Sequence, residues 1–400
     1  MKTQLFILWF LVISPHFYSQ IIDGGNGHSI IKDNNGMVWT IGKNDHGQLG
    51  TGSITSAYIP VKIKGLTNIT AISRGYNHSL AIDDQGKLFT WGSNSYGQLG
   101  NSTTVDAHLP VAIDFSEKVI AIEGGYTHST FLTSKGEVYC MGHNYFGELG
   151  DGTREHSNYP VRVIMESGKP LKNIVSIVSV GCHTLALDKT GVLWGWGNND
   201  FRQLLFTEDK MVTSAVQISL PFKPSTIAVG WHHSIAIDQS GELWGWGSDP
   251  AFERDVSVGE FYQEPRKFPL SEKIISIACG SWHSLAISES GSVYSWGKNN
   301  FGMLGTGDTV CKSEPMLIPA LSNITNIAGG CFQSLCVDRN GDLFSFGDNP
   351  AGQLGIGNKN RQLSPLKTVF NLNTGLDKKE AKNLRSALIE TPITWKSCFL

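Results

Sequence analysis

Short apolar runs separated by turn-forming residues recur along the whole chain. In one stretch, residues 69–73, 79–83, 87–92 and 110–113 form four such runs, each of four to six residues and so too short for typical helices. The second and third runs are joined by DDQG, in which the leading Asp and the closing Gly are typical of a type I turn. This pattern predicts a unit of four β-strands.

The two middle strands of the unit are apolar on both faces. The run SLAI at 79–82 and the run LFTW at 88–91 lack the alternation of apolar and polar residues that a strand with one wet face shows. In the third strand, Phe89 and Trp91 share one face, while the smaller Thr90 is on the other. A large face against a small face is suited to sheets that stack and interdigitate, so we expect both faces to be buried.

The unit recurs seven times. The His of a His-Ser or His-Thr pair returns at steps of 50, 50, 55, 50 and 50 residues, and Gln333 takes its place after a further 50: His28, His78, His128, His183, His233 and His283. The copies start near residues 21, 71, 121, 176, 226, 276 and 326, and the longer step fits a longer loop around 165–172. Since seven stacked sheets leave no bare end face only when they close into a ring, the repeats predict a β-propeller.

The sequence thus predicts an all-β fold. It is a seven-bladed β-propeller of four-stranded antiparallel blades over residues 20–371, followed by a short C-terminal tail over residues 372–400. The apolar Leu376, Leu384 and Leu388 of the tail predict that it is partly helical, and we expect it to be dispensable for folding.

The repeat resembles a known family. The segment GYNHSLAIDDQGKLFTWGSNSYGQLG at 75–100 and its copies are similar to the regulator of chromosome condensation repeat, and the likeness covers residues 21–370. The resemblance implies that family's seven-bladed propeller. Similar propellers serve as guanine nucleotide exchange factors for a small nuclear GTPase, as plant ultraviolet-light receptors, as parts of large ubiquitin ligases and as secreted bacterial inhibitors of β-lactamase. The likeness is therefore specific for the fold and not for one function.

The first 19 residues have the pattern of a secretory signal peptide. Lys2 precedes nine apolar residues at 5–13, a run too short to span a bilayer. Cleavage between Ser19 and Gln20 would leave the first strand whole, although Phe17 is bulky where a small residue is expected. We expect a secreted or extracytoplasmic protein without a membrane span. The alternative for this segment is an odd N-terminal strand or an uncleaved anchor. If the N-terminus is not cleaved, we expect a cytosolic protein instead.

Composition disfavours several classes of partner and chemistry. The net charge of −3 comes without a run of Lys or Arg, so we expect no nucleic-acid binding. The seven Cys show no CxxC spacing and fit small buried positions, although one pair could form a disulfide in a secreted protein. No Ser-His-Asp order, paired carboxylates or phosphate-binding loop stands out. We expect no enzymatic activity, no catalytic residues and no cofactor.

The repeated His residues are the one regular set of potential metal ligands. Equivalent positions on seven blades form a wide ring, so they lie too far apart to share one ion. We expect each of these residues to be structural, bonded to the backbone beside its Ser or Thr, and we expect no metal site.

One rim of the propeller is the candidate binding site. The loops between the first and second strands and between the third and fourth strands emerge on it, and they carry aromatic residues in most copies. Copies four and five also depart from the Gly-Gln-Leu-Gly loop pattern. Aromatic residues and Arg dominate binding hot spots. The candidates for partner binding are Tyr76, Tyr126, Trp231, Phe252, Glu253, Arg254, Tyr262 and Trp282.

The alternative for these rings is that they fill gaps between blades, because aromatic residues bury readily. On the first interpretation the protein is a monomeric, secreted or cell-surface, non-enzymatic propeller that binds another protein on this rim, as a scaffold or an inhibitor-like module. The alternative function is guanine nucleotide exchange on a small GTPase, as in the family's nuclear member. The signal peptide and the lack of a basic tail count against it.

Overall fold

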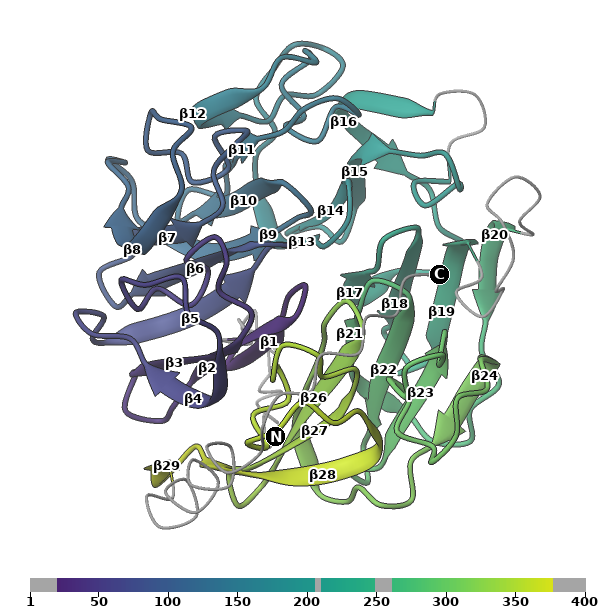
Figure 1. Cartoon of the computed structure of the whole chain (residues 1–400). Coiled ribbons are helices and arrows are strands. Elements are labelled where there is room, and N and C mark those ends of the chain that lie inside the picture. Colours follow the sequence, from purple (N-terminus) through teal and green to yellow (C-terminus); the bar gives the residue numbers. More distant parts are fainter. Residues whose placement is uncertain (1–19, 206–209, 249–260, 377–400) are drawn as a thin grey trace, which may run out of the picture.

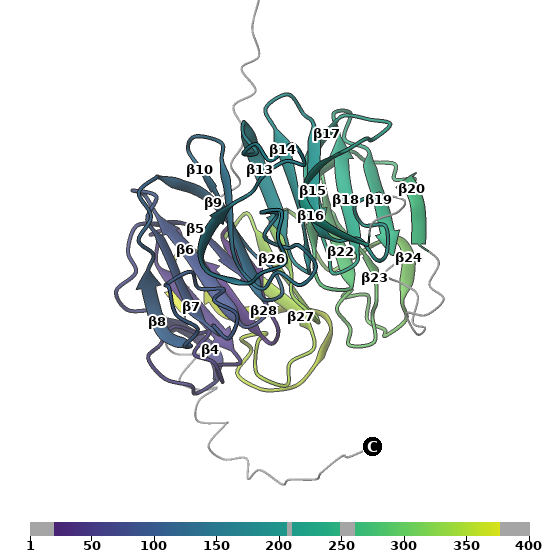
Figure 2. The ribbon, with the colours of Figure 1, turned by 90° about the horizontal axis from the view of Figure 1, so that it is seen from above.

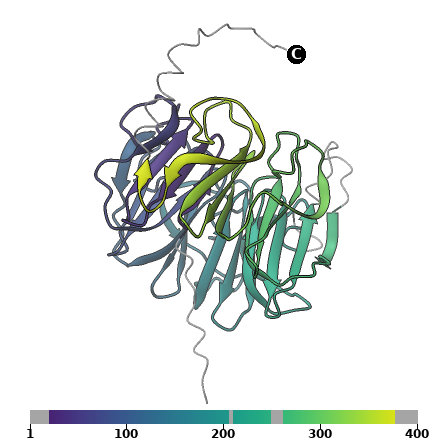
Figure 3. The same cartoon turned by 90° about the horizontal axis from the view of Figure 1, so that it is seen from below.

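Seven antiparallel sheets form a closed ring in the computed structural model, which describes residues 20–205, 210–248 and 261–376 (Figure 1). In each sheet the strands follow one another in chain order, with the first strand at the axis and the fourth at the outside. Figures 2 and 3 show the ring from two opposite sides, with the strands running between its two rims. The all-β, seven-bladed propeller predicted from the repeats is confirmed.

The strands of the blades have the following bounds. Blade one consists of β1 (Ile22–Gly24), β2 (His28–Lys32), β3 (Val38–Gly42) and β4 (Ala57–Lys62), and blade two of β5 (Ile69–Arg74), β6 (His78–Asp83), β7 (Leu88–Gly92) and β8 (Ala107–Ala112). Blade three consists of β9 (Val119–Gly124), β10 (His128–Thr133), β11 (Val138–Gly142) and β12 (Ser157–Arg162), and blade four of β13 (Ile174–Ser179), β14 (His183–Asp188), β15 (Leu193–Asn198) and β16 (Met211–Ile218). Blade five consists of β17 (Pro224–Val229), β18 (His233–Asp238), β19 (Leu243–Ser248) and β20 (Phe261–Lys267), and blade six of β21 (Ile274–Cys279), β22 (His283–Ser288), β23 (Val293–Gly297) and β24 (Lys312–Leu317). Blade seven consists of β25 (Ile324–Gly329), β26 (Gln333–Asp338), β27 (Asp342–Gly347), β28 (Gln362–Asn371) and β29 (Gly375–Leu376).

The outermost strand of blade two begins three residues earlier than the sequence predicts, at Ala107 instead of Pro110. Val111 pairs with Thr90, but the register then shifts and Ala107 pairs with Gly92. Pro110 lies inside this irregular stretch on an edge strand, where its missing N–H removes no ladder bond. Proline therefore does not mark the start of the strand here.

Neighbouring blades pack against each other through the large apolar residues of their third strands. Trp91 is fully buried, and its indole N–H donates to the carbonyl of Gln48 in the preceding blade at 2.9 Å. Gly50 has a φ of 65°, and a Cβ there would lie 2.8 Å from the same indole nitrogen. The loop that holds Gln48 and Gly50 thus provides both an acceptor and the space for the next blade's ring, and the carbonyls of Glu148 and Gln203 accept Trp196 and Trp246 in the same way.

The repeated His residues join neighbouring blades. His78 Nε2 lies 2.9 Å from the hydroxyl oxygen of Ser129, which belongs to the next blade, and His283 makes the equivalent contact with Ser334 at 2.8 Å. The expectation of a backbone partner was wrong, because stacking places the hydroxyl of the following copy against each ring. The structural role stands. Among the described residues, no group of three or more His, Cys, Asp or Glu is placed to hold a metal ion.

Blade seven continues past the predicted boundary at residue 371. β29 pairs with β28 through Phe370 and Leu376, and Leu372 is buried with its N–H bonded to the carbonyl of Gly341. Residues 377–400, where the tail helix was expected, lie outside the described residues. No helix in the described ranges has the length and apolar character needed to cross a membrane.

Candidate functional site

Two sets of loops emerge side by side on one rim. The N–H of Ser93, at the start of a loop between third and fourth strands, donates to the carbonyl of Asn77, in a loop between first and second strands, at 2.9 Å. The same bond joins Lys298 to Trp282 at 2.9 Å. The aromatic residues that the sequence places on these loops therefore share a rim.

The residue two positions before the repeated His bonds through its backbone to the following blade in several copies. The backbone N–H of Tyr76 donates to Gly125, that of Tyr126 to Gly181, and that of Trp231 to Ser281, at 3.1, 2.8 and 2.9 Å. Each bond links one blade to the next, so these loops form a circle around the axis. Large side chains on these loops can therefore reach one another across the axis.

Three rings fill that centre. The ring centroids of Tyr76 and Tyr126 are 4.5 Å apart, and the ring of Trp231 is 5.4 Å from Tyr126 and 6.1 Å from Tyr76, nearly parallel to the latter. Tyr76 belongs to blade two and Trp231 to blade five, so the contact crosses the axis. Gly181 makes room for it, because a Cβ there would lie 2.7 Å from Cδ1 of Trp231.

The cluster continues outward over blades five and six. Trp282 packs edge-on against Trp231 at 5.2 Å, and His232 lies 5.1 Å from Trp282 and 4.3 Å from Phe201. The ammonium nitrogen of Lys298 lies 4.4 Å from the centre of the Trp282 ring, a cation–π contact. We call this set the aromatic face, and it comprises Tyr76, Tyr126, Phe201, Trp231, His232, Trp282 and Lys298.

The aromatic face is neutral apart from Lys298. Burial raises the pKa of Tyr76 to about 12 and also raises the pKa of Tyr126, so both phenols keep their protons at neutral pH. Burial lowers the pKa of His232 to about 4, so its imidazole is uncharged there. All seven side chains are half-buried. The face therefore presents rings, phenol donors and one cation to the solvent.

The structure brings four of the eight candidate residues together: Tyr76, Tyr126, Trp231 and Trp282. Tyr262 lies instead on the outermost strand of blade five, opposite Gly247, where its hydroxyl accepts a hydrogen bond from Arg266 at 2.7 Å. Phe252, Glu253 and Arg254 lie outside the described residues.

Two residues of the aromatic face, His232 and Lys298, were not among those predicted from the sequence. Lys298 directly follows the Gly that ends a third strand, and in every copy the residue at this position bonds to the one just before the repeated His or Gln. Combining these two periodic positions would have placed Lys298 beside Trp282.

The cysteines of the described residues form no disulfide. The six Cys of the described residues are free thiols, and four of them are buried: Cys140, Cys279, Cys331 and Cys336. Burial raises the pKa of Cys140 to about 12, which keeps this thiol protonated and unreactive. Cys398 lies outside the described residues.

Comparisons with known proteins agree with this architecture. The RCC1-like domain matches residues 12–254, and two forms of the regulator of chromosome condensation (RCC1) repeat match residues 290–337 and 274–302. Human WBSCR16 is similar in structure, with 26% identity, a TM-score of 0.70, and coverage of 78% of this chain and 85% of that chain. Prp20p from Saccharomyces cerevisiae has 22% identity, a TM-score of 0.75, and coverage of 93% and 96%. Yeast RCC1 (Prp20) bound to Kap60 has 21% identity, a TM-score of 0.75, and coverage of 97% and 98%. No curated protein matches by sequence. With more than half of its length matched by one family model, the chain belongs to the RCC1-like domain family.

Proposed function

We propose that this protein is a secreted or cell-surface propeller that binds another protein through the aromatic face and has no enzymatic activity. The observation that carries the proposal is the meeting of Tyr76, Tyr126 and Trp231 at one end of the axis, where the rings stay half-exposed. Trp and Tyr are the residues that dominate binding hot spots, and they do so near the centre of an interface. Lys298 adds a charge that can select an acidic or carbonyl-rich partner surface.

Related propellers give the proposal general support. Yeast Prp20p binds Gsp1p and histones, and one of its solved structures has Kap60 bound. A propeller of this shape can therefore carry protein-binding surfaces. We infer the same class of activity for this chain and a partner of its own.

The binding test compares two half-buried tryptophans. Trp282 belongs to the aromatic face, whereas Trp244 lies near the opposite rim, where its indole N–H bonds to Asp238 at 3.0 Å. A partner is first captured from the extracellular medium and identified by mass spectrometry, and its affinity is then measured by calorimetry. Trp282→Ala should weaken binding by about 2 kcal/mol or more, roughly 30-fold, while Trp244→Ala leaves it unchanged.

Equal affinity of both variants would show that the rings of the aromatic face are packing residues. Trp231→Ala extends the test to the axis. Tyr262→Ala asks whether the surface reaches the outer strand of blade five. Melting curves of all four variants separate a loss of binding from a loss of folded protein.

Export has its own test. β1 begins at Ile22, so cleavage between Ser19 and Gln20 leaves every strand intact. N-terminal sequencing of protein from the medium should therefore start at Gln20. Full-length protein confined to the cytosol would favour the alternative role instead, and an acceleration of GDP release from a small nuclear GTPase would then establish guanine nucleotide exchange.

A further inference from the structure

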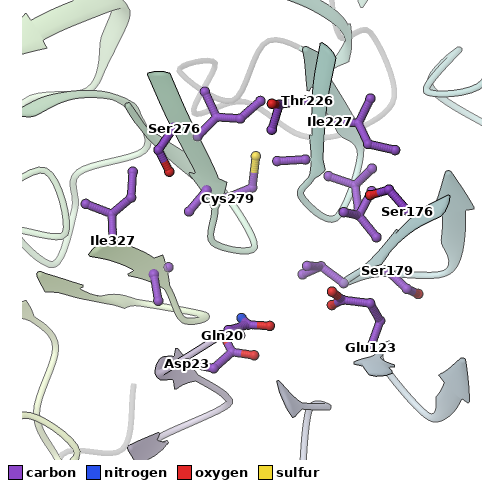
Figure 4. A pocket seen from close by; sticks show the side chains of 18 of the residues that line it. Gln20, Asp23, Glu123, Ser176, Ser179, Thr226, Ile227, Ser276, Cys279 and Ile327 are labelled. Atoms are coloured by element: carbon purple, nitrogen blue, oxygen red, sulfur yellow. The ribbon is translucent and has the colours of Figure 1, made fainter. Parts of the chain in front are cut away.

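A cavity of about 270 Å³ lies between the innermost strands of the blades (Figure 4). The innermost strands of all seven blades line it, from β1 to β25. Arg74 and Glu123 lie on its wall, and only two or three residues further along the chain are Tyr76 and Tyr126, whose rings meet across the axis. The aromatic face therefore lies toward one end of the cavity.

The wall is divided into an apolar and a charged part. The residue five positions before the repeated His or Gln is aliphatic in blades four to seven, and it is acidic in blades one and three, as Asp23 and Glu123. The four aliphatic residues all line the cavity: Val178, Ala228, Ala278 and Ala328.

Asp23 is fully paired. Its two carboxylate oxygens accept hydrogen bonds from Nε and the backbone N–H of Arg74, at 3.2 and 3.1 Å, and from the N–H of Gly24 at 2.8 Å. Nη2 of Arg74 also donates a hydrogen bond to the carbonyl of Gly329 at 2.7 Å. The side chain of Arg74 is 3% exposed and that of Asp23 is 7% exposed. The positive charge of Arg74 is thus held at Asp23.

Glu123 has no such partner. Within the described residues, its carboxylate takes part in no hydrogen bond or ion pair, and it projects into the cavity beside Asp23 (Figure 4). Burial, with a further contribution from the charge of Asp23, raises the pKa of Glu123 well above its usual value. Because Asp23 and Arg74 pair with each other, Glu123 is the acidic side chain on the described cavity wall that has no partner, and this half-buried side chain faces the cavity.

We propose that the cavity is a binding site for a small organic cation whose primary ammonium group pairs with Glu123. A metal ion fits less well, because hard cations take six or more oxygen ligands and Glu123 is a single free carboxylate. Val178, Ala228 and Ala278 form an apolar wall suited to an alkyl chain.

Hydroxyl groups on the cavity wall can bind the other end of the ligand. Two residues before the aliphatic positions, blades four to six carry the hydroxyls of Ser176, Thr226 and Ser276, which also line the cavity. Two residues of a strand span about 7 Å. A ligand with an ammonium group at Glu123 and a hydrogen-bonding group about 7 Å further along the axis therefore reaches the level of these hydroxyls.

The probe is 5-aminopentan-1-ol, added to the purified protein in phosphate buffer at pH 7 and followed by calorimetry, with 1,5-pentanediol as its neutral analogue. We expect one amino alcohol to bind per chain and the diol to bind at least tenfold more weakly. Glu123→Gln should weaken amine binding at least tenfold. Glu166→Gln, which changes an exposed glutamate far from the axis, should leave it unchanged.

A second variant keeps every charge and removes the space. Ala278→Leu places a larger side chain on the cavity wall and should also weaken amine binding at least tenfold, so the test does not depend on the folding of one variant. The proposal is overturned if wild-type protein binds neither probe, if the diol binds as well as the amine, or if Glu123→Gln binds the amine with wild-type affinity. None of these measurements requires a protein partner, so the site can fail or stand independently of the aromatic face.

Discussion

The hydroxyl of Ser29 in blade one donates a hydrogen bond to the backbone carbonyl of Gln353 in blade seven, 324 residues away, at 3.0 Å. The same bond joins Ser79 to Gln48 between blades one and two at 2.9 Å. The junction between blades seven and one therefore uses the same hydrogen bond as the junction between blades one and two. The two junctions differ in one respect. The carbonyl of Gln48 also accepts from the indole of Trp91, whereas in blade one the residue equivalent to this Trp is Ile41.

Ser29→Ala should therefore destabilise the protein more than Ser79→Ala. The first change leaves the buried carbonyl of Gln353 without a partner, at a cost of about 2 kcal/mol. The second leaves Trp91 bonded to Gln48 and removes only a long contact of 3.4 Å with Nε2 of His28, so it should cost about 1 kcal/mol. Urea unfolding of both variants measures the difference. Equal losses would mean that the indole bond does not compensate.

Gly75→Ala should be strongly destabilising for a steric reason. A Cβ at Gly75 would overlap the imidazole of His78, which is buried. We expect a loss of about 3 kcal/mol. The matched control is Gly65→Ala, where φ is +85° and no atom lies within 4 Å, so only backbone strain of about 1 kcal/mol should appear. Thermal melting of the two variants would contradict this view if their midpoints fell equally.

Acid should unfold the propeller through its buried histidines. Burial lowers the pKa of His78 and His283 to about 3 and that of His128 to about 4. Since an unfolded His takes up a proton near pH 6.5, each ring contributes stability that is present above that pH and is lost as the pH falls toward the folded value. In this range the free energy of unfolding falls by about 1.4 kcal/mol per pH unit for each buried His. The raised pKa of Glu123 acts in the opposite direction and offsets part of it.

The measurement is the denaturation midpoint between pH 7.5 and 4.5. His283→Gln places at blade six the residue that blade seven already has in Gln333, and it should reduce the slope by about one proton. His108→Gln, at an exposed position, should keep the wild-type slope. A slope that is the same in all three proteins would rule out the buried rings as its source.

Removal of residues 372–400 should destabilise the propeller, in contrast to the expectation from sequence. Leu372 is 2% exposed in the core between blades seven and one, and its carbonyl accepts the N–H of Asn34. Its loss should cost about 3 kcal/mol. A chain ending at Leu376 keeps this residue and β29. If both truncated proteins melted together, Leu372 would have no role in holding the end of blade seven.

The repeated pattern was sufficient to predict the number of blades, their strands and their closure into a ring. Most blades use the same contacts, so each contact leaves a mark at the same position in most copies: the His beside its Ser or Thr, the Gly that ends the third strand, and the Trp or Phe that faces the preceding blade. The pattern of one copy is weak evidence for a fold, but seven copies with the same spacing are strong evidence. The partner of each His was not visible in this way, because the hydroxyl it reaches lies 51 residues away in the next blade.

The candidate sites depended on positions where the copies differ, and here the sequence was a partial guide. Loop positions placed Tyr76 and Trp231 on one rim, but their contact across the axis, the cation over Trp282 and the unpaired Glu123 appear only in the folded ring. A closed ring brings equivalent positions of non-neighbouring blades to one axis. Residues far apart in the chain then share a small volume, and which exceptions to the repeat meet there follows from ring geometry and not from any local pattern.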